Sequence, residues 1–196
     1  MATAQRPLTD YLEFVSPLVT DDYAEYRDDT AIKRLCKHRA IKESTRTFWP
    51  RGGPQWDGLA FSPTQNIFLF EAKSHIRELV GGGCAASKQS RAQIDRALAA
   101  VKQHCGVSKE FSWTGQFYQH ANRLAHLYWF RVVQRYPAHL VYVLFTGDQE
   151  MRGPATEQSW RGAIELMEHS MGLAAHSLRP FIHYVFVDLS ELNRNA

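Results

Sequence analysis

Apolar and polar positions follow two different periods along the chain, and together they predict an alternation of strands and helices. Runs rich in aromatic and β-branched residues predict strands, whereas apolar residues spaced three or four apart predict helices. The expected strands cover residues 46–49, 56–61, 66–72, 140–145 and 181–187. One expected helix begins at residue 21, and the others cover residues 87–105, 116–136 and 156–170. This order predicts an α/β fold in which helices pack on a central sheet.

The length and composition of the chain favour one globular domain over residues 1–196. Of the 196 residues, 44% are hydrophobic and 22% are charged, which suits one well-filled core and is too little for two. Residues 1–20, which contain two prolines, are expected to form an irregular N-terminal arm. Residues 189–196 are polar and are expected to form a loose tail.

Three charged residues lie near the ends of two consecutive expected strands. Asp57 is near the start of the first strand, and Glu71 and Lys73 are at the end of the second. The two strands are joined by Ser62-Pro63-Thr64-Gln65, a segment typical of a hairpin connection. Because side chains alternate across a strand, Glu71 and Lys73 are expected on the same face, where Asp57 from the neighbouring strand can join them.

Two chemical interpretations of these three residues follow from the sequence. Carboxylate oxygens are hard, anionic ligands that suit Mg²⁺ or Mn²⁺. A lysine beside them can orient or help deprotonate an attacking water, or offset the charge that develops on a phosphate. The other interpretation is structural, with Lys73 simply paired with Asp57 or Glu71 in a buried ion pair.

The segments Pro54-Gln55-Trp56-Asp57 and Glu71-Ala72-Lys73 together resemble the signature of the PD-(D/E)xK nuclease superfamily, the restriction-endonuclease-like proteins. Here two residues separate the Pro from the Asp, which are adjacent in the signature. The αβββαβ core of that superfamily, a central mixed sheet flanked by helices, matches the expected order of elements with one extra helix. The resemblance implies hydrolysis of phosphodiester bonds in DNA with Mg²⁺ or Mn²⁺ as cofactor.

The resemblance also implies further metal ligands. Many members of the superfamily place a Glu from the first helix beside the motif Asp, and Glu25 is the best match here, with Asp28, Asp29 and Glu43 as rivals. The carbonyl group of Ala72 is expected as another ligand. By periodicity Glu25 falls on an apolar stripe at a helix start, where it either points into the metal site or reaches solvent at a frayed end.

Several polar residues around the motif are candidate substrate contacts. In related nucleases a Gln or Lys on the helix after the E-x-K strand faces the active site, so Gln93 and secondarily Gln89 are expected to hold a water or a phosphate. A plain exposed Gln is the alternative. Lys88 adds positive charge to the same helix. Arg51, in a Gly- and Pro-rich loop, and His75, directly after the motif, are expected to touch phosphate, or else to lie in a surface turn and at a strand end.

The long helical pattern over residues 116–136 interleaves aromatic residues with His120, Arg123 and His126. Aromatic and basic side chains together can offer a surface on which bases stack. A helix that packs on a sheet needs this many apolar groups in any case. We therefore expect most of these residues in the core and at its rim.

Charge and cysteine usage narrow the class of protein. A formal net charge of +3 and a pI near 8.8 permit a nucleic-acid partner without requiring one. Cys36, Cys84 and Cys105 are scattered, which argues against a zinc ribbon or a disulfide framework and favours reduced thiols in the cytoplasm. No export leader and no apolar run of about eighteen residues is evident, so no membrane contact is expected.

A second function remains open beside the nuclease. A catalytically inactive module with the same fold would bind nucleic acid or a protein partner through the same surface. The mild basic charge fits this alternative equally well. Members of the superfamily often act as dimers, so a homodimer is a further expectation that the resemblance implies.

Overall fold

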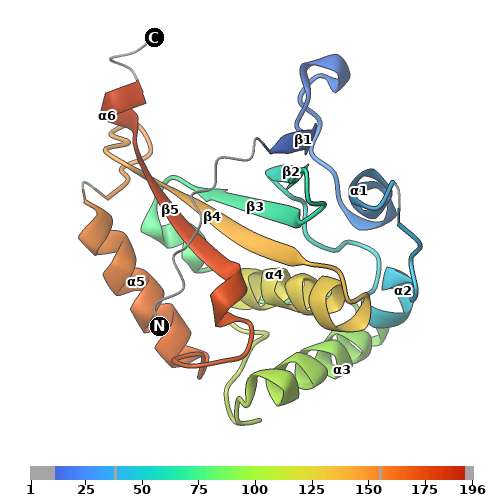
Figure 1. Ribbon diagram of the computed structural model, residues 1–196. Helices are drawn as coiled ribbons and strands as arrows, with labels where there is room; N and C mark the ends of the chain where they lie inside the picture. The colour runs from blue at the N-terminus through green and yellow to red at the C-terminus, as the bar shows by residue number, and fades with distance from the viewer. Residues whose placement is uncertain (1–11, 38, 155, 193–196) are drawn as a thin grey trace, which may run out of the picture.

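The computed structural model describes residues 12–37, 39–154 and 156–192 and has an α/β architecture (Figure 1). Its strands are β1 (Glu13–Ser16), β2 (Gly58–Phe61), β3 (Ile67–Lys73), β4 (Ala138–Thr146) and β5 (Ile182–Asp188). The longer helices are α1 (Asp28–Leu35), α3 (Lys88–Cys105), α4 (Tyr118–Tyr128) and α5 (Glu157–Ser170). Short turns of helix are η1 (Val19–Asp21), α2 (Thr45–Phe48), η2 (Ile76–Leu79), the π-helical η3 (Trp129–Val133), η4 (Arg179–Phe181) and α6 (Leu189–Leu192).

The five strands form one mixed, open sheet in the order β1-β2-β3-β4-β5. The first three are an antiparallel meander, and β3, β4 and β5 run parallel. Parallel neighbours require a crossover connection, and these are α3 with α4 between β3 and β4, and α5 between β4 and β5 (Figure 1). A mixed sheet with flanking helices confirms the predicted α/β class.

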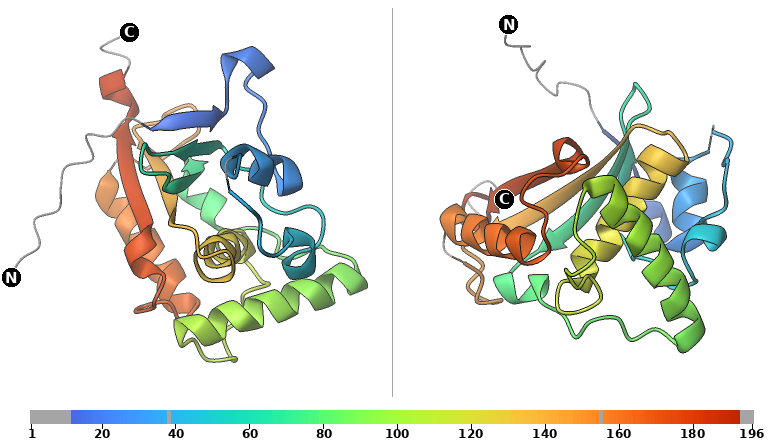
Figure 2. Two further views of the ribbon diagram at one scale, coloured as in Figure 1. Left: turned by 45° about the vertical axis from the view of Figure 1, so that its right-hand side comes forward. Right: turned by 90° about the horizontal axis from the view of Figure 1, so that it is seen from below.

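One face of the sheet is covered by α4 and α5, and α3 lies outside α4 (Figure 2). The main core lies in this layer and contains the fully buried Trp113, Trp129 and Trp160 beside Leu69 and Leu140. Burial of these large apolar groups is the dominant favourable contribution to folding. The same layer also covers the side chains of β3 that face the helices, including those of Glu71 and Lys73.

The opposite face of the sheet has its own, smaller apolar cluster. Ala60, Phe68 and Val141 are buried there, with Phe70 and Val143 packed around them. Because both faces of β3 are covered, Ile67, Phe68 and Leu69 are successive buried residues, the near-continuous apolar run that a central strand carries.

The predicted strand at residues 46–49 is wrong. These residues lie in and just after the helical turn α2, whose N-cap Ser44 accepts a hydrogen bond from the amide of Arg46 at 3.2 Å. Such a cap favours a helical start over an extended chain. The first strand of the meander is instead β1, within the segment expected to be an irregular arm. Residues 1–11 of that arm lie outside the described residues.

The predicted helix from residue 21 also starts too early. Asp22 and Tyr23 have positive φ angles of 56° each, which a continuing α-helix does not allow. The chain then extends and Tyr26 forms an antiparallel bridge with Trp56 before α1 begins. The strand β1 therefore precedes the first helix of the chain, contrary to the expected order.

Two further boundaries differ from the prediction. The helix expected over residues 116–136 begins at Tyr118 and changes to the π-helical turn η3 after Tyr128. The first part of the expected loose tail forms the short helix α6, and residues 193–196 lie outside the described part of the chain. Neither difference alters the layers of the fold.

Truncation of Leu69 to Ala tests the position of the main core. Leu69 is 0% exposed beneath the helices, so the cavity left by Leu69→Ala is expected to lower the free energy of unfolding by about 2–5 kcal/mol. Val185→Ala is the control, because Val185 on β5 is 45% exposed and its truncation is expected to cost less than about 1 kcal/mol. Urea unfolding followed by circular dichroism measures both. Equal losses would contradict this placement of the core.

Candidate functional site

Glu71 and Lys73 lie on the helix-covered face of β3, as the alternation of side chains predicts. Their side chains form an ion pair of 2.6 Å between Glu71 Oε1 and Lys73 Nζ. Glu71 is only 2% exposed and Lys73 only 8%. A carboxylate buried to this degree needs a close counter-charge, because its desolvation costs several kcal/mol.

Arg123 on α4 supplies a second counter-charge. Its Nε donates to Glu71 Oε2 at 2.7 Å, so each carboxylate oxygen of Glu71 is held by a different cation. The guanidinium of Arg123 also donates to the carbonyl oxygen of Gln55 at 3.1 Å and lies over the ring of Trp56. Arg123 thus connects α4 to both strands that carry the sequence motif.

Asp57, the residue just before β2, completes the arrangement. Its Oδ2 accepts a hydrogen bond of 2.6 Å from the amide of Ala72, between Glu71 and Lys73. Burial raises the pKa of Asp57, and the charge of Glu71 raises it further, whereas the Ala72 amide and Lys73 lower it. We call Asp57, Glu71, Lys73 and Arg123 the Glu71 cluster.

Glu25 lies next to this cluster but not on a helix. The bridge between Tyr26 and Trp56 sets the preceding residue, Glu25, alongside Asp57, and the charge of Glu25 contributes to the raised pKa of Asp57 after the larger effect of burial. The carboxylate of Glu25 is exposed and accepts a hydrogen bond of 2.8 Å from Gln55 Nε2. It is the third acid of the region.

A small polar cavity between β3, α4 and α5 borders the Glu71 cluster. Glu71, Lys73 and Arg123 line it, together with Glu78, Gln119, His120 and Tyr142. His120 Nδ1 lies 2.7 Å from the hydroxyl oxygen of Tyr142, and His120 Nε2 has no partner among the described residues. Burial lowers the pKa of His120 to about 3, so this imidazole is neutral at physiological pH.

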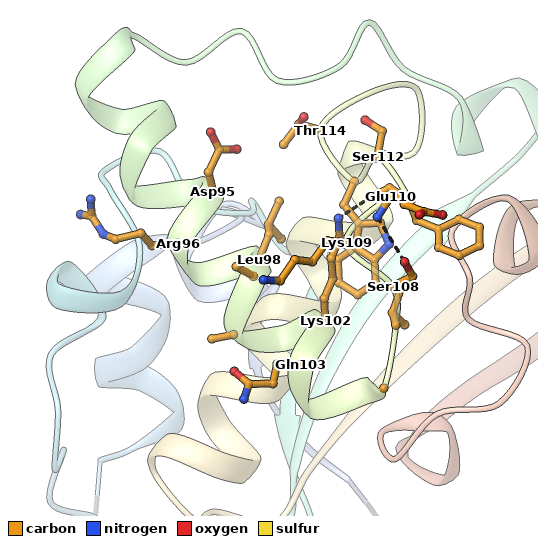
Figure 3. A pocket seen from close by; sticks show the side chains of 16 residues that line it. Asp95, Arg96, Leu98, Lys102, Gln103, Ser108, Lys109, Glu110, Ser112 and Thr114 are labelled. Carbon is orange, nitrogen blue, oxygen red and sulfur yellow. Dashed lines mark hydrogen bonds between the residues drawn. The ribbon is translucent and has the colours of Figure 1, made fainter.

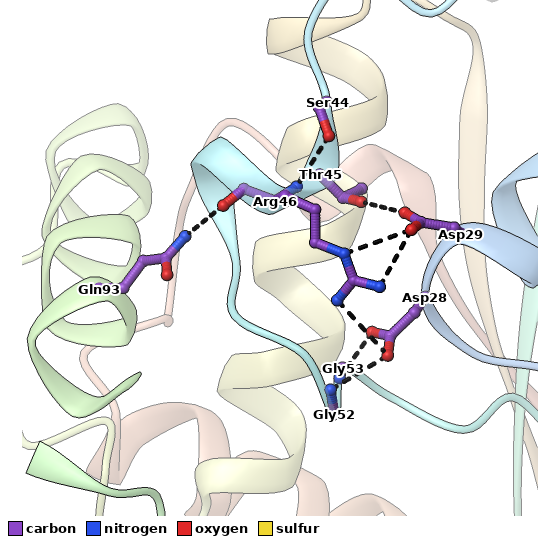
Figure 4. Close-up of polar contacts among 8 residues, drawn as sticks. All are labelled: Asp28, Asp29, Ser44, Thr45, Arg46, Gly52, Gly53 and Gln93. Atoms are coloured by element: carbon purple, nitrogen blue, oxygen red, sulfur yellow. Dashed lines mark hydrogen bonds and ion pairs between the residues drawn. The ribbon is translucent and has the colours of Figure 1, made fainter. Parts of the chain in front are cut away.

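The expected rivals of Glu25 serve a different purpose. Asp28 accepts hydrogen bonds from the amides of Gly52 and Gly53 at 3.1 and 2.9 Å, and Asp29 forms an ion pair of 3.0 Å with Arg46 (Figure 4). These contacts fix the loop before Asp57 against the start of α1. Glu43 accepts a hydrogen bond from the Thr47 hydroxyl.

Gln93 belongs to this second network rather than to the Glu71 cluster. Its Nε2 donates to the carbonyl oxygen of Arg46 at 2.7 Å, which joins α3 to α2 (Figure 4). Lys88 and Gln89 are exposed at the start of α3, and Arg51 is exposed in the loop that Asp28 holds. Of these expected substrate contacts and His75, only His75 lies close in the chain to the end of the motif strand β3.

A separate groove lies between α3 and residues 106–114 (Figure 3). Basic and acidic side chains alternate along it, with Arg96 and Lys109 beside Asp95 and Glu110. Lys102 lies inside, where it donates to the carbonyl of Phe111. None of the cluster residues lines this groove, so it is separate from the candidate site.

No family model, curated protein or solved structure matches the chain. Function is therefore inferred from the chemistry of the Glu71 cluster and its surroundings. Within the described residues, no group of three His, Cys, Asp or Glu side chains is arranged to hold a metal ion. None of the described helices combines the length and the apolar character needed to cross a bilayer.

Arg123 is the member of the Glu71 cluster whose position the sequence does not reveal. It is separated from Glu71 by 52 residues and lies in the stretch of α4 from His120 to Leu127, in which every residue is buried. Four polar residues in a buried stretch need partners inside the protein. Such a pattern indicates that these side chains have partners inside the protein, but it does not identify the partner of each one.

A double-mutant cycle tests the buried pair of Glu71 and Arg123. Glu71→Gln leaves two buried cations without their carboxylate, and Arg123→Met removes one of the two counter-charges of Glu71. Each change alone is expected to lower the free energy of unfolding by about 3–5 kcal/mol. The double variant is expected to lose clearly less than the sum. Chemical unfolding measures all four proteins. The surface pair of Glu157 and Arg161, 42% and 63% exposed, is the control, with an expected coupling below about 1 kcal/mol.

A pH series tests the environment of Asp57. Its pKa is raised by burial, so folding favours the protonated carboxyl, and ionisation of Asp57 lowers stability at pH values above the raised pKa. Asp57→Asn is therefore expected to raise the free energy of unfolding at pH 7. The gain is expected to shrink as the pH falls toward about 4, the unfolded-state value. Urea unfolding between these pH values measures it, and a variant less stable than wild type at pH 7 would contradict the assignment.

Proposed function

We propose that the chain is a metal-dependent nuclease that hydrolyses phosphodiester bonds in DNA. One observation carries the proposal: Glu71 pairs with Lys73 at the end of β3, and the carboxylate of Asp57 is hydrogen-bonded to the amide of Ala72 between them. This is the arrangement that the resemblance to PD-(D/E)xK nucleases assigns to the catalytic site. The raised pKa of Asp57, caused first by burial and also by Glu71, is typical of a functional carboxylate.

The order of elements gives partial support to a restriction-endonuclease-like core. The antiparallel meander, the helical crossover after the E-x-K strand and the parallel strand β4 follow the expected succession. The departure is at the start, where β1 precedes α1 instead of following it. The αβββαβ interpretation therefore rests on the meander and the crossover helices. These elements, with the residue just before β2, carry all four residues of the Glu71 cluster.

The donor set suits Mg²⁺ or Mn²⁺ by its chemistry. Asp57 and Glu71 offer carboxylate oxygens, Ala72 offers its carbonyl oxygen directly after Glu71, and Glu25 adds a further acid beside Asp57. Hard oxygen donors of this kind are the ones these cations prefer. A bound cation would lower the pKa of water and offset negative charge on the phosphate.

The protein's own residues supply position and charge for the reaction. Lys73 orients the attacking water, or stabilises the charge that develops on the phosphate oxygens. Arg123 holds the second oxygen of Glu71, opposite the oxygen that pairs with Lys73. His120, neutral and buried, contributes a hydrogen-bonding nitrogen at the edge of the same cavity.

The alternative function, a catalytically inactive module that binds nucleic acid or protein, is favoured by one specific observation. Both oxygens of Glu71 are already satisfied, by Lys73 and Arg123. Their two positive charges balance the two negative charges of Asp57 and Glu71, so the Glu71 cluster is complete as a structural ion network. In this interpretation no divalent cation enters.

A cleavage assay tests the nuclease proposal. Wild-type protein, Asp57→Ala and Lys73→Ala are each incubated with plasmid, linear and branched DNA in Mg²⁺ or Mn²⁺. Wild type is expected to cleave at least one substrate. Each variant is expected to be about 100-fold slower or worse, because Asp57→Ala removes a proposed metal ligand and Lys73→Ala removes a charge that stabilises the transition state. Arg161→Ala, on the surface of α5, is the control that retains activity. Equal activity in all proteins, or none in any, would overturn the proposal.

A Mn²⁺ titration separates the two functions without any turnover. A nuclease site is expected to bind Mn²⁺, with loss of binding in Asp57→Ala and full binding in Arg161→Ala. An inactive module is expected to give the same weak signal in all three proteins. Electron paramagnetic resonance measures the concentration of free Mn²⁺, and the bound fraction follows by difference from the total.

A further inference from the structure

A cleft opens where the motif strand β3 ends. It lies between η2, which follows β3 after two residues, and the loop that follows β4. Its walls are His75, Ile76 and Arg77 on one side and Met151, Arg152 and Ser159 on the other. The cleft is therefore at the carboxyl ends of two parallel strands, the edge of an open α/β sheet at which ligands bind most often.

The lining of this cleft is basic. Arg77 and Arg152 are both exposed, and neither forms an ion pair with any residue that the structure describes. Among the residues that the structure describes, no acidic side chain lines the cleft, in contrast to the groove along α3, where Asp95 and Glu110 balance the basic residues (Figure 3). Two arginines without carboxylate partners make a cleft that attracts anions.

His75 gives the cleft an unused polar group. Its ring Nδ1 is buried and has no hydrogen-bond partner among the described residues. The backbone around it is fixed, because Glu78 Oε1 accepts hydrogen bonds from the amides of Ser74 and His75 at 2.8 and 2.9 Å. The carboxylate of Glu78 is thus engaged with the backbone.

The short helix η2 is a wall shared by the cleft and the catalytic cavity. Ile76 and Arg77 face the cleft, whereas Glu78 and Leu79 line the cavity of Glu71 and Lys73. The cleft and the cavity are therefore adjacent across η2. The exposed apolar side chain of Met151 adds a surface on which a sugar or base can lie.

We propose that this cleft binds the phosphodiester backbone of a nucleic-acid strand, next to the phosphate that is cleaved at the Glu71 cluster. Guanidinium groups bind phosphate through paired hydrogen bonds, and Arg77 and Arg152 are free to do so from opposite walls. This inference rests on the proposed function for its substrate. Binding is measured apart from cleavage, so the two proposals can fail separately.

The test is a binding measurement without divalent cation. Fluorescently labelled single-stranded and duplex DNA are titrated in EDTA with Asp57→Ala, which prevents cleavage, and with the same protein carrying Arg77→Ala and Arg152→Ala. The arginine variant is expected to bind about 10-fold more weakly. The slope of its log affinity against log salt concentration is expected to become less steep by about 2. The control carries Arg96→Ala and Lys109→Ala in the groove along α3 and is expected to bind as its parent does.

Each outcome decides the proposal. Unchanged affinity in the arginine variant, or an equal loss in the control, would overturn the cleft as a binding site. Competition by poly-glutamate as strong as that by unlabelled DNA would also overturn it, because the cleft would then recognise charge alone. A specific loss in the arginine variant, combined with no cleavage by wild type, would support the cleft while removing the nuclease.

Discussion

The burial of one ionised carboxylate, Glu71, constrains the structure around it. A charge taken out of water costs several kcal/mol unless close partners compensate for it. At Glu71 these partners come from two places in the chain, Lys73 on the same strand and Arg123 on α4. The position of α4 over the sheet is therefore fixed by electrostatics as well as by the apolar core beneath it. The loop before β2 is drawn into the same arrangement, because Arg123 also holds the carbonyl of Gln55.

The second network, around Arg46, supports the first from outside. Asp28 fixes the amides of the glycine-rich loop, Arg46 pairs with Asp29, and Gln93 joins α2 to α3. None of these side chains touches Glu71. Their effect is to hold the segment that delivers Asp57 to the end of β2. A displacement of this loop would separate Asp57 from the amide of Ala72, a contact of 2.6 Å, so the site depends on residues that take no direct part in its chemistry.

The sequence predicts what local rules determine and misses what distant partners determine. The strand β3, with Glu71 and Lys73 on one face, follows from side-chain alternation alone. The aromatic Phe48 and Trp49 favour a strand over the residues of α2, but the N-cap Ser44 starts a helical turn there. Glu25 was expected on a helix and lies instead in an extended segment beside Asp57. The position of Arg123 depends on packing between α4 and β3, which no local pattern encodes.

The energetics of the Glu71 cluster bear on the choice between catalysis and structure. Apolar residues of similar size would fill the same space with equal or greater stability, because a buried ion network gains little net free energy. Burial also disfavours the ionised form of Asp57, whose pKa is raised. The Ala72 amide and Lys73 offset part of the cost of burying this second carboxylate, and its raised pKa indicates that they do not offset all of it. A metal-dependent site needs that second carboxylate, and the cost in stability is the kind that functional sites carry.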